Sequence, residues 1–165
     1  LQQFGALVRA CQIAGALEKM ADLTVNYVRE RQQFGRSLGR FQAIQHKVAE
    51  LVAESALAAA AAQQAVRFLV QAPAPFAGQS KAAMAIASAK AVTSEAAGKV
   101  ARDAHQAHGA MGFSFEYPLQ QYSRRVWTWR EEFGSEFYWA EQLGHAVAAC
   151  TASDTPGSVW ETVSS

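Results

Sequence analysis

A basic and amide-rich stretch lies between Arg31 and Gln42, with the sequence RQQFGRSLGRFQ. Arginine pairs with phosphate oxygens through two parallel hydrogen bonds, and Gly35 and Gly39 allow the backbone to approach a ligand closely. The start of the helix expected after this stretch would add unpaired N–H groups and the positive end of a helix dipole. We interpret the stretch as a candidate anion site. The alternative is a polar interhelical loop whose aromatic side chains close the end of a core.

A second candidate centre is an acidic and aromatic segment near residue 133. Glu131, Glu132 and Glu136 surround Gly134, and a carboxylate can serve as a general base. The tryptophans and phenylalanines of the same segment would form a wall against a flat cofactor, an acyl chain or another subunit. Two alternatives stay open for the acids, a catalytic role and a solvated helix face.

The sequence gives little support for a metal site, a serine nucleophile or a glycine-rich nucleotide site. His105 and His108 are three residues apart, but no acidic or cysteine partner is placed to complete a metal site, so no metal is expected. His108 is expected at a helix C-terminus, where a positive charge is favoured. No serine has a histidine at a recognisable spacing, and no glycine-rich nucleotide motif occurs.

Length and composition indicate one soluble domain. The chain has 165 residues and a net charge of +1, with its charges spread along the sequence, which argues against a nucleic-acid surface. No apolar run reaches the roughly 18 residues that a membrane helix requires. Cys11 and Cys150 each lie in an apolar helical pattern, so we expect both to be buried in a reducing compartment and the protein to be cytoplasmic.

Four amphipathic patterns account for most of the chain, at residues 2–31, 41–70, 79–108 and 119–150. In each, apolar residues recur every three or four positions, and no segment is typical of a strand. The fourth pattern is interrupted near Gly134 and then continues with Phe137 on its apolar face. We predict an all-α fold, an up-down-up-down four-helix bundle over residues 1–151, followed by a flexible tail over residues 152–165.

Four motifs, in order and spacing, resemble the C-terminal domain of acyl-CoA dehydrogenases. They are RQQFG at 31–35, FQAI at 41–44, QAHGAMGF at 106–113 and EYP at 116–118. In that family the domain is a helical bundle that follows an N-terminal helical domain and a middle β domain, usually within a tetramer. The chain opens without methionine in a helical pattern, and we expect it to be part of a longer protein.

The resemblance implies that the basic stretch binds FAD together with a neighbouring subunit. Arg31 takes the place of the arginine that contacts the FAD pyrophosphate, and Gln42 that of a glutamine beside the adenine. Gln106, Gly109 and Ala110 fall on the family's Q-x-x-G-G segment, with alanine in place of its second glycine. The residues expected to contact FAD are Arg31, Gln33, Phe34, Leu38, Phe41, Gln42, Gln106, Gly109, Ala110, Gly134 and Ser135.

The resemblance also shows where this chain departs from the family's catalytic pattern. Dehydrogenation needs a glutamate, commonly just before a Gly-Thr pair, to remove the substrate's α-proton while flavin N5 accepts the β-hydride. Here a Gly-Ser pair follows Phe133, and phenylalanine cannot accept a proton. The family's other base position, on the first helix, maps to about Gly5. A local bulge would allow Glu132 or Glu131 to act as the base, and otherwise a partner chain supplies it.

The expected activity belongs to the full-length protein. The chain would form part of an acyl-CoA dehydrogenase of fatty acid metabolism, which oxidises an acyl-CoA thioester with FAD and passes electrons to a transfer partner. The isolated bundle should be inactive, because most of the flavin pocket lies in other domains. The alternative is a non-catalytic FAD-binding or structural subunit of a heteromeric dehydrogenase. Either protein is expected to be a dimer or tetramer, as a homo-oligomer or a hetero-oligomer.

Overall fold

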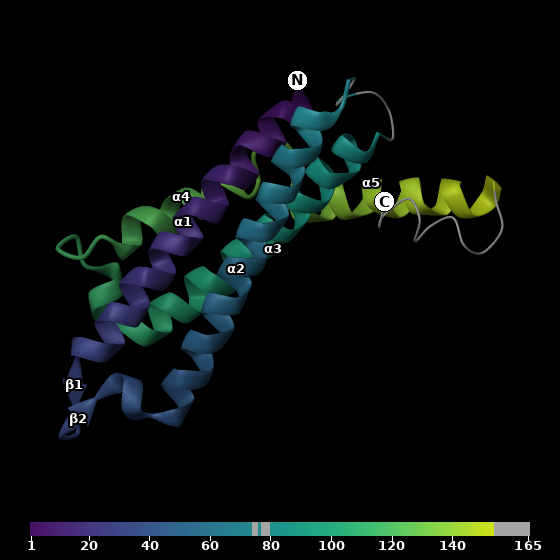
Figure 1. The fold of residues 1–165 in the computed structure, drawn as a ribbon. Helices are drawn as coiled ribbons and strands as arrows, with labels where there is room; N and C mark the ends of the chain where they lie inside the picture. The colour runs from purple at the N-terminus through teal and green to yellow at the C-terminus, as the bar shows by residue number, and fades with distance from the viewer. Residues whose placement is uncertain (74–75, 77–79, 154–165) are drawn as a thin grey trace.

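The computed structural model describes residues 1–73, 76 and 80–153, with the backbone alone for residues 150–153. Three long helices, α1 (Gln2–Glu30), α2 (Gln42–Gln71) and α3 (Lys81–His108), lie side by side (Figure 1). The shorter α4 (Leu119–Trp129) packs against α1 and α3, and α5 (Glu136–Ser153) packs against α3. The predicted all-α bundle is confirmed in these described parts.

The core of the bundle combines small and large apolar side chains. Alanine is the commonest buried residue of α2 and α3, and its small side chain lets the axes of neighbouring helices approach closely. One cluster lies in the half of the bundle where α4 joins the long helices, and Leu119 and Val126 of α4 contribute to it. A second cluster lies near the start of α1, where Trp139 of α5 packs against Leu7 and Ile86.

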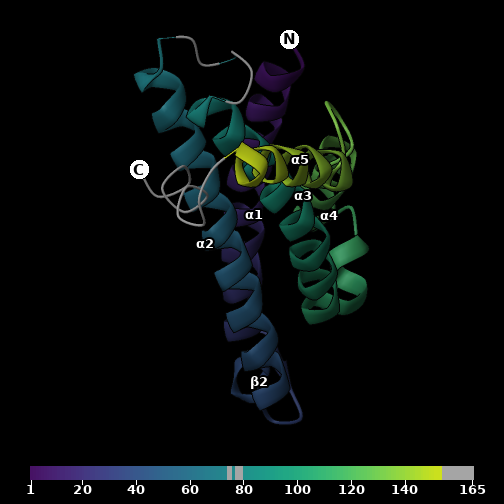
Figure 2. The same cartoon turned by 90° about the vertical axis from the view of Figure 1, so that its right-hand side faces the viewer.

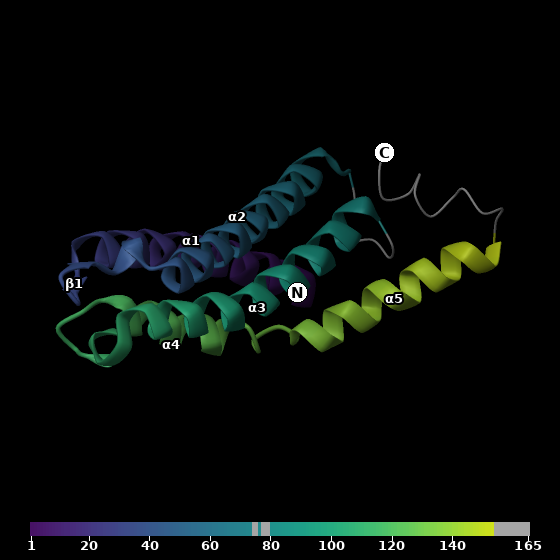
Figure 3. The same ribbon diagram turned by 90° about the horizontal axis from the view of Figure 1, so that it is seen from below.

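The fourth amphipathic pattern forms two helices instead of one interrupted helix. The helix is interrupted between α4 and α5 at Phe133 and Gly134, whose φ angles are +58° and +102°. α5 then crosses α3 and continues beyond the bundle (Figures 2 and 3). This break also changes the buried face of the last helix. Phe137 is 77% exposed, contrary to the prediction, whereas Trp139 is buried, because helical periodicity does not continue across a break in the helix.

A short antiparallel ribbon, absent from the predictions, follows α1. Strands β1 (Gln32–Gln33) and β2 (Arg36–Ser37) pair across a turn. Both turn residues, Phe34 and Gly35, have positive φ angles, of 52° and 76°, as a type I′ hairpin turn requires. The 3-10 helix η1 (Leu38–Arg40) leads from this hairpin into α2. A ribbon of two residues a strand is too short to leave an alternating hydrophobic pattern in the sequence.

Some further predictions can be compared with the structure. The long helices begin and end within two residues of their predicted limits. Cys11 is exposed and not buried, because it lies at the edge of the apolar face of α1. The side chain of Cys150 and most of the predicted tail, residues 154–165, lie outside the described residues, while residues 152 and 153 belong to α5. Among the described helices, none has the length and apolar character needed to cross a membrane.

Candidate functional site

The predicted FAD residues of the basic stretch surround the hairpin at one end of the bundle. Arg31, Gln33 and Gln42 are exposed, whereas Leu38 and Phe41 are half-buried. The guanidinium of Arg36 lies 4.0 Å above the ring of Phe41. Leu38 donates its backbone N–H to the carbonyl of Arg31 (2.9 Å), which closes the hairpin. The guanidinium of Arg31 and the side-chain amides of Gln33 and Gln42 take no part in these contacts and are available to an anion.

The aromatic residues of the hairpin do not close the end of the core. Phe34 is 89% exposed, and its ring meets Phe41 edge to face at a centroid distance of 6.2 Å. The alternative reading of this loop as a hydrophobic plug therefore fails for Phe34. An exposed aromatic ring beside arginine side chains is suited to contact with a flat, anionic ligand.

The second group of predicted FAD residues, Gln106, Gly109 and Ala110, belongs to the end of α3 and the segment after it, which lie at the same end of the bundle as β1 (Figure 3). All three are exposed at the end of α3 and the start of the 3-10 helix η2 (Gly109–Phe113). Gly109 has a φ of +59°, so a side chain at this position would be strained. The structure thus brings two motifs, 64 residues or more apart in the chain, to one exposed end.

Two buried histidines support this end from beneath. His108 stacks on Tyr27 of α1 at 4.3 Å, and the Tyr27 hydroxyl donates to the His108 carbonyl at 3.4 Å. His105 stacks on Phe113 at 4.2 Å. His108 is the last residue of α3, as predicted, and burial is the largest influence that lowers the pKa of both imidazoles. No cluster of potential metal ligands occurs in the described part of the chain.

The two positions to which the resemblance assigns the catalytic base lie against each other in the structure. Gly5 is buried near the start of α1, and the ring of Phe133 lies directly on it. A Cβ atom added to Gly5 would lie only 2.6 Å from Cγ of Phe133. A phenyl ring and a glycine therefore occupy the place where either base would stand, and neither can accept a proton.

The carboxylates proposed as substitutes are held in ion pairs. Glu132 Oε2 accepts from Arg9 Nε at 2.5 Å, and the Arg9 guanidinium lies 5.6 Å from the centre of the Trp129 ring. Glu131 is exposed and pairs with Arg130 at 3.2 Å. The structure thus places neither carboxylate at the Gly5–Phe133 contact.

One predicted group is separated from the others. Gly134 and Ser135 lie at the α4–α5 junction, beside the start of α1, whereas the hairpin follows the end of α1. From Gly5 to Glu30 a helix rises by about 38 Å at 1.5 Å per residue. A single FAD at the hairpin of one chain is therefore too far from the junction of that chain to contact both.

Lys90 is a residue of this region that sequence analysis missed. Its side chain is fully buried, and its ammonium donates to the carbonyls of Arg130 (2.7 Å) and Gly134 (2.9 Å) and to Ser94 Oγ (2.9 Å). Burial, the largest influence, lowers the pKa of Lys90 to about 8. A lysine within the alanine-rich apolar face of α3 was the available signal.

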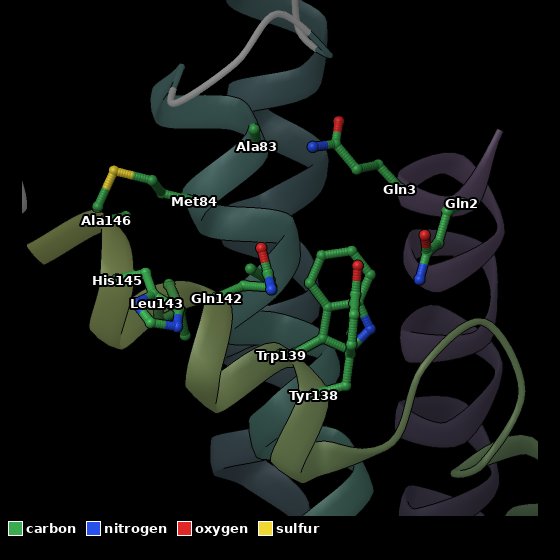
Figure 4. A pocket seen from close by; sticks show the side chains of 11 residues that line it. Gln2, Gln3, Ala83, Met84, Tyr138, Trp139, Gln142, Leu143, His145 and Ala146 are labelled. Carbon is green, nitrogen blue, oxygen red and sulfur yellow. The ribbon is translucent and has the colours of Figure 1, made fainter. Parts of the chain in front are cut away.

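A cavity of about 240 Å³ lies between the starts of α1 and α3 and the side of α5 (Figure 4). Gln3, Met84, Tyr138 and Trp139 are among the residues that line it. The Oε1 atom of Gln3 is buried there without a hydrogen-bond partner among the described residues. None of the predicted FAD residues lines this cavity, so it is separate from the hairpin end.

The family model of the acyl-CoA dehydrogenase C-terminal domain matches residues 3–147. The chain belongs to the acyl-CoA dehydrogenase family. Acyl-CoA dehydrogenase IpdE2 of Mycolicibacterium smegmatis is 32% identical to it over 126 residues, which are 76% of this chain and 37% of that protein. This dehydrogenase domain thus spans about a third of that relative's length.

Solved structures confirm the fold of this acyl-CoA dehydrogenase domain. Glutaryl-coenzyme A dehydrogenase in its glutaryl-CoA complex matches with a TM-score of 0.78 and 27% identity, over 90% of this chain and 36% of that one. The ChsE4-ChsE5 complex of Mycobacterium tuberculosis matches with a TM-score of 0.81 and 24% identity, over 94% of this chain and 39% of that one. Members of the family use FAD.

Proposed function

We propose that this chain is the C-terminal domain of a supporting subunit in an oligomeric, FAD-dependent acyl-CoA dehydrogenase. In this proposal the subunit contributes to an FAD site and another chain supplies the catalytic base. The observation that supports it most directly is the contact of Phe133 with Gly5. Of the two alternatives open from the sequence, this contact favours the non-catalytic subunit.

The hairpin end retains what an FAD site needs from this domain. Arg31 and Gln42 are exposed, and Gly109 adopts the backbone conformation that favours glycine beside Gln106. These residues would hold the pyrophosphate and the adenine side of the cofactor, as the resemblance implies. When bound, FAD supplies a flavin that accepts the β-hydride of an acyl-CoA. The residues of this chain position the cofactor and leave proton removal to another subunit.

An oligomer explains the separation of the predicted FAD residues. Because the length of α1 separates the hairpin from Gly134 and Ser135, one cofactor can meet both groups only if two chains contribute. An apolar groove beside the hairpin, lined by Val25, Ile44 and Val48 among others, has a volume of about 580 Å³. Its position next to the hairpin supports a subunit contact there.

The competing candidate is a complete dehydrogenase in which Glu132 is the base. This function would require the carboxylate to leave Arg9 and the junction to change shape until Glu132 reached the place of Phe133. The ion pair opposes this change, since the guanidinium stabilises the ionised carboxylate where it stands.

Anaerobic titration of the full-length protein with a panel of acyl-CoA thioesters tests the proposal. We expect flavin absorbance to bleach in the assembly purified with its partner chain, and to persist in the full-length chain alone. Bleaching in the chain alone that disappears in Glu132→Gln but persists in Glu136→Gln would instead identify Glu132 as the base. Absence of flavin from both preparations would contradict the FAD assignment.

A further inference from the structure

Lys90 of α3 has the largest fully buried side chain among the described residues, and it is 0% exposed. Burial of an ammonium group is costly unless every N–H finds an acceptor. An ammonium has three donors, and three acceptors surround this one: Ser94 Oγ, the Arg130 carbonyl and the Gly134 carbonyl. Two of the three acceptors belong to the α4–α5 junction, so the lysine also binds the backbone of that junction.

The junction carbonyls need such donors. Arg130 is the C-cap of α4, where the last carbonyls of a helix lack intrahelical partners and the dipole is negative. Lys90 binds the carbonyl at this end and the carbonyl of Gly134 four residues later. Between them, the carbonyl of Phe133 accepts from the indole N–H of Trp139 at 3.0 Å. Side chains of α3 and α5 therefore hold three carbonyls of the short loop between α4 and α5.

The backbone of this loop requires external support. Phe133 has a φ of +58°, in a region that L-residues rarely adopt and that persists when surrounding contacts hold it. A lysine that served only to fill the core would bury its methylene stem and direct its ammonium to solvent. Lys90 instead directs its ammonium to the carbonyls on both sides of Phe133.

We propose that Lys90 is a positioning residue, which fixes the backbone of residues 130–135 and thereby holds the ring of Phe133 over Gly5. The inference deepens the proposed function, because this contact is what closes the base position of the supporting subunit. Lys90 acts through the junction and touches neither substrate nor cofactor.

Hydrogen exchange measured by mass spectrometry on the full-length protein with its partner tests this role. Lys90→Met keeps the length of the stem and removes all three donors. Lys99→Met is the matched control, because Lys99 lies on the same helix but pairs with Glu54 and Glu95 at the surface. Lys90→Arg restores a positive charge and several donors.

We expect exchange in residues 130–135 to accelerate about tenfold or more in Lys90→Met, as the loss of one or two buried hydrogen bonds would produce. Lys99→Met should match the wild type, and Lys90→Arg should recover part of the protection. Unchanged exchange at the junction in Lys90→Met would overturn the proposal.

A uniform acceleration through α1, α2 and α3 in Lys90→Met would be decided by Ser94→Ala, which retains the lysine but removes one acceptor of its ammonium and the hydroxyl that donates to the Arg130 carbonyl at 3.3 Å. Exchange that rises at the junction alone in Ser94→Ala supports positioning, and a uniform or absent rise overturns it. Because exchange does not depend on flavin or turnover, failure here is distinguishable from failure of the proposed function.

Discussion

The ring of Phe133 lies against the backbone of Gly5, and these are the two residues to which the resemblance assigns the catalytic base. A glutamate at position 5 would meet the ring, and a glutamate at position 133 would lie where the ring lies now. The Phe133 ring fits where it is because Gly5 has no side chain, and position 5 has no room for a side chain while the ring lies there. The two residues, neither of which carries a carboxylate, therefore depend on each other for their packing.

The same contact predicts the effect of adding one methyl group. Gly5→Ala would place a Cβ against the Phe133 ring, and relief of this overlap should cost about 1–3 kcal/mol of the free energy of unfolding. Chemical denaturation of the full-length protein would measure it. Gly15→Ala is the control, because no atom lies within 4 Å of its Cβ position, and it should stabilise α1 by about 0.5–1 kcal/mol.

The double variant Gly5→Ala/Phe133→Ala completes this test. Without the ring, the alanine at position 5 should be tolerated, so the two substitutions should be strongly non-additive. Additive losses would show that the ring does not rest on Gly5 in solution.

Arg31→Ala should weaken FAD retention in the full-length protein. The loss of a charged hydrogen bond to a phosphate oxygen costs roughly 1.5–3 kcal/mol, which would appear as a lower flavin-to-protein ratio after dialysis. Arg67→Ala removes an exposed arginine of α2 far from the hairpin and should leave the ratio unchanged. Equal flavin content in both variants would contradict the role of Arg31.

The Arg9–Glu132 ion pair should be measurable as a coupling energy. Its side chains are 25% and 35% exposed, so solvent screens the pair and the coupling should be about 0.5–1 kcal/mol. A double-mutant cycle of Arg9→Gln and Glu132→Gln in urea unfolding measures it. Glu132→Gln should leave turnover by the assembled enzyme unchanged, and a severe loss of turnover would identify Glu132 as catalytic.

Lys90 should make stability depend on alkaline pH. Its pKa is lowered from 10.5 to about 8 in the folded protein, so between these values the unfolded chain binds more protons than the folded one. The contribution of Lys90 to the free energy of unfolding should therefore rise with pH across this window and stay constant below it. Subtracting the profile of Lys90→Met from that of the wild type isolates this contribution, and a flat or falling difference would contradict the lowered pKa.

The local pattern of apolar residues was sufficient to predict much of the fold. The apolar stripes of the three long helices predicted their limits to within two residues, because helical periodicity is a property of neighbouring positions. The motifs near Arg31 and Gln106 also pointed to residues that the structure brings to one exposed end of the bundle. The β1–β2 hairpin and the buried face of α5 were missed, since a four-residue ribbon has no pattern and a break resets the phase of the helix that follows.

The sequence by itself determined the family and the helical bundle, and it predicted two base positions without an acid. Only the tertiary structure decided how those positions relate to each other. Gly5 and Phe133 lie near opposite ends of the chain, and Lys90 reaches carbonyls 40 and 44 residues away. Such contacts depend on how helices pack and where the loop between α4 and α5 directs its side chains, and this information is not contained in the spacing of residues along the chain.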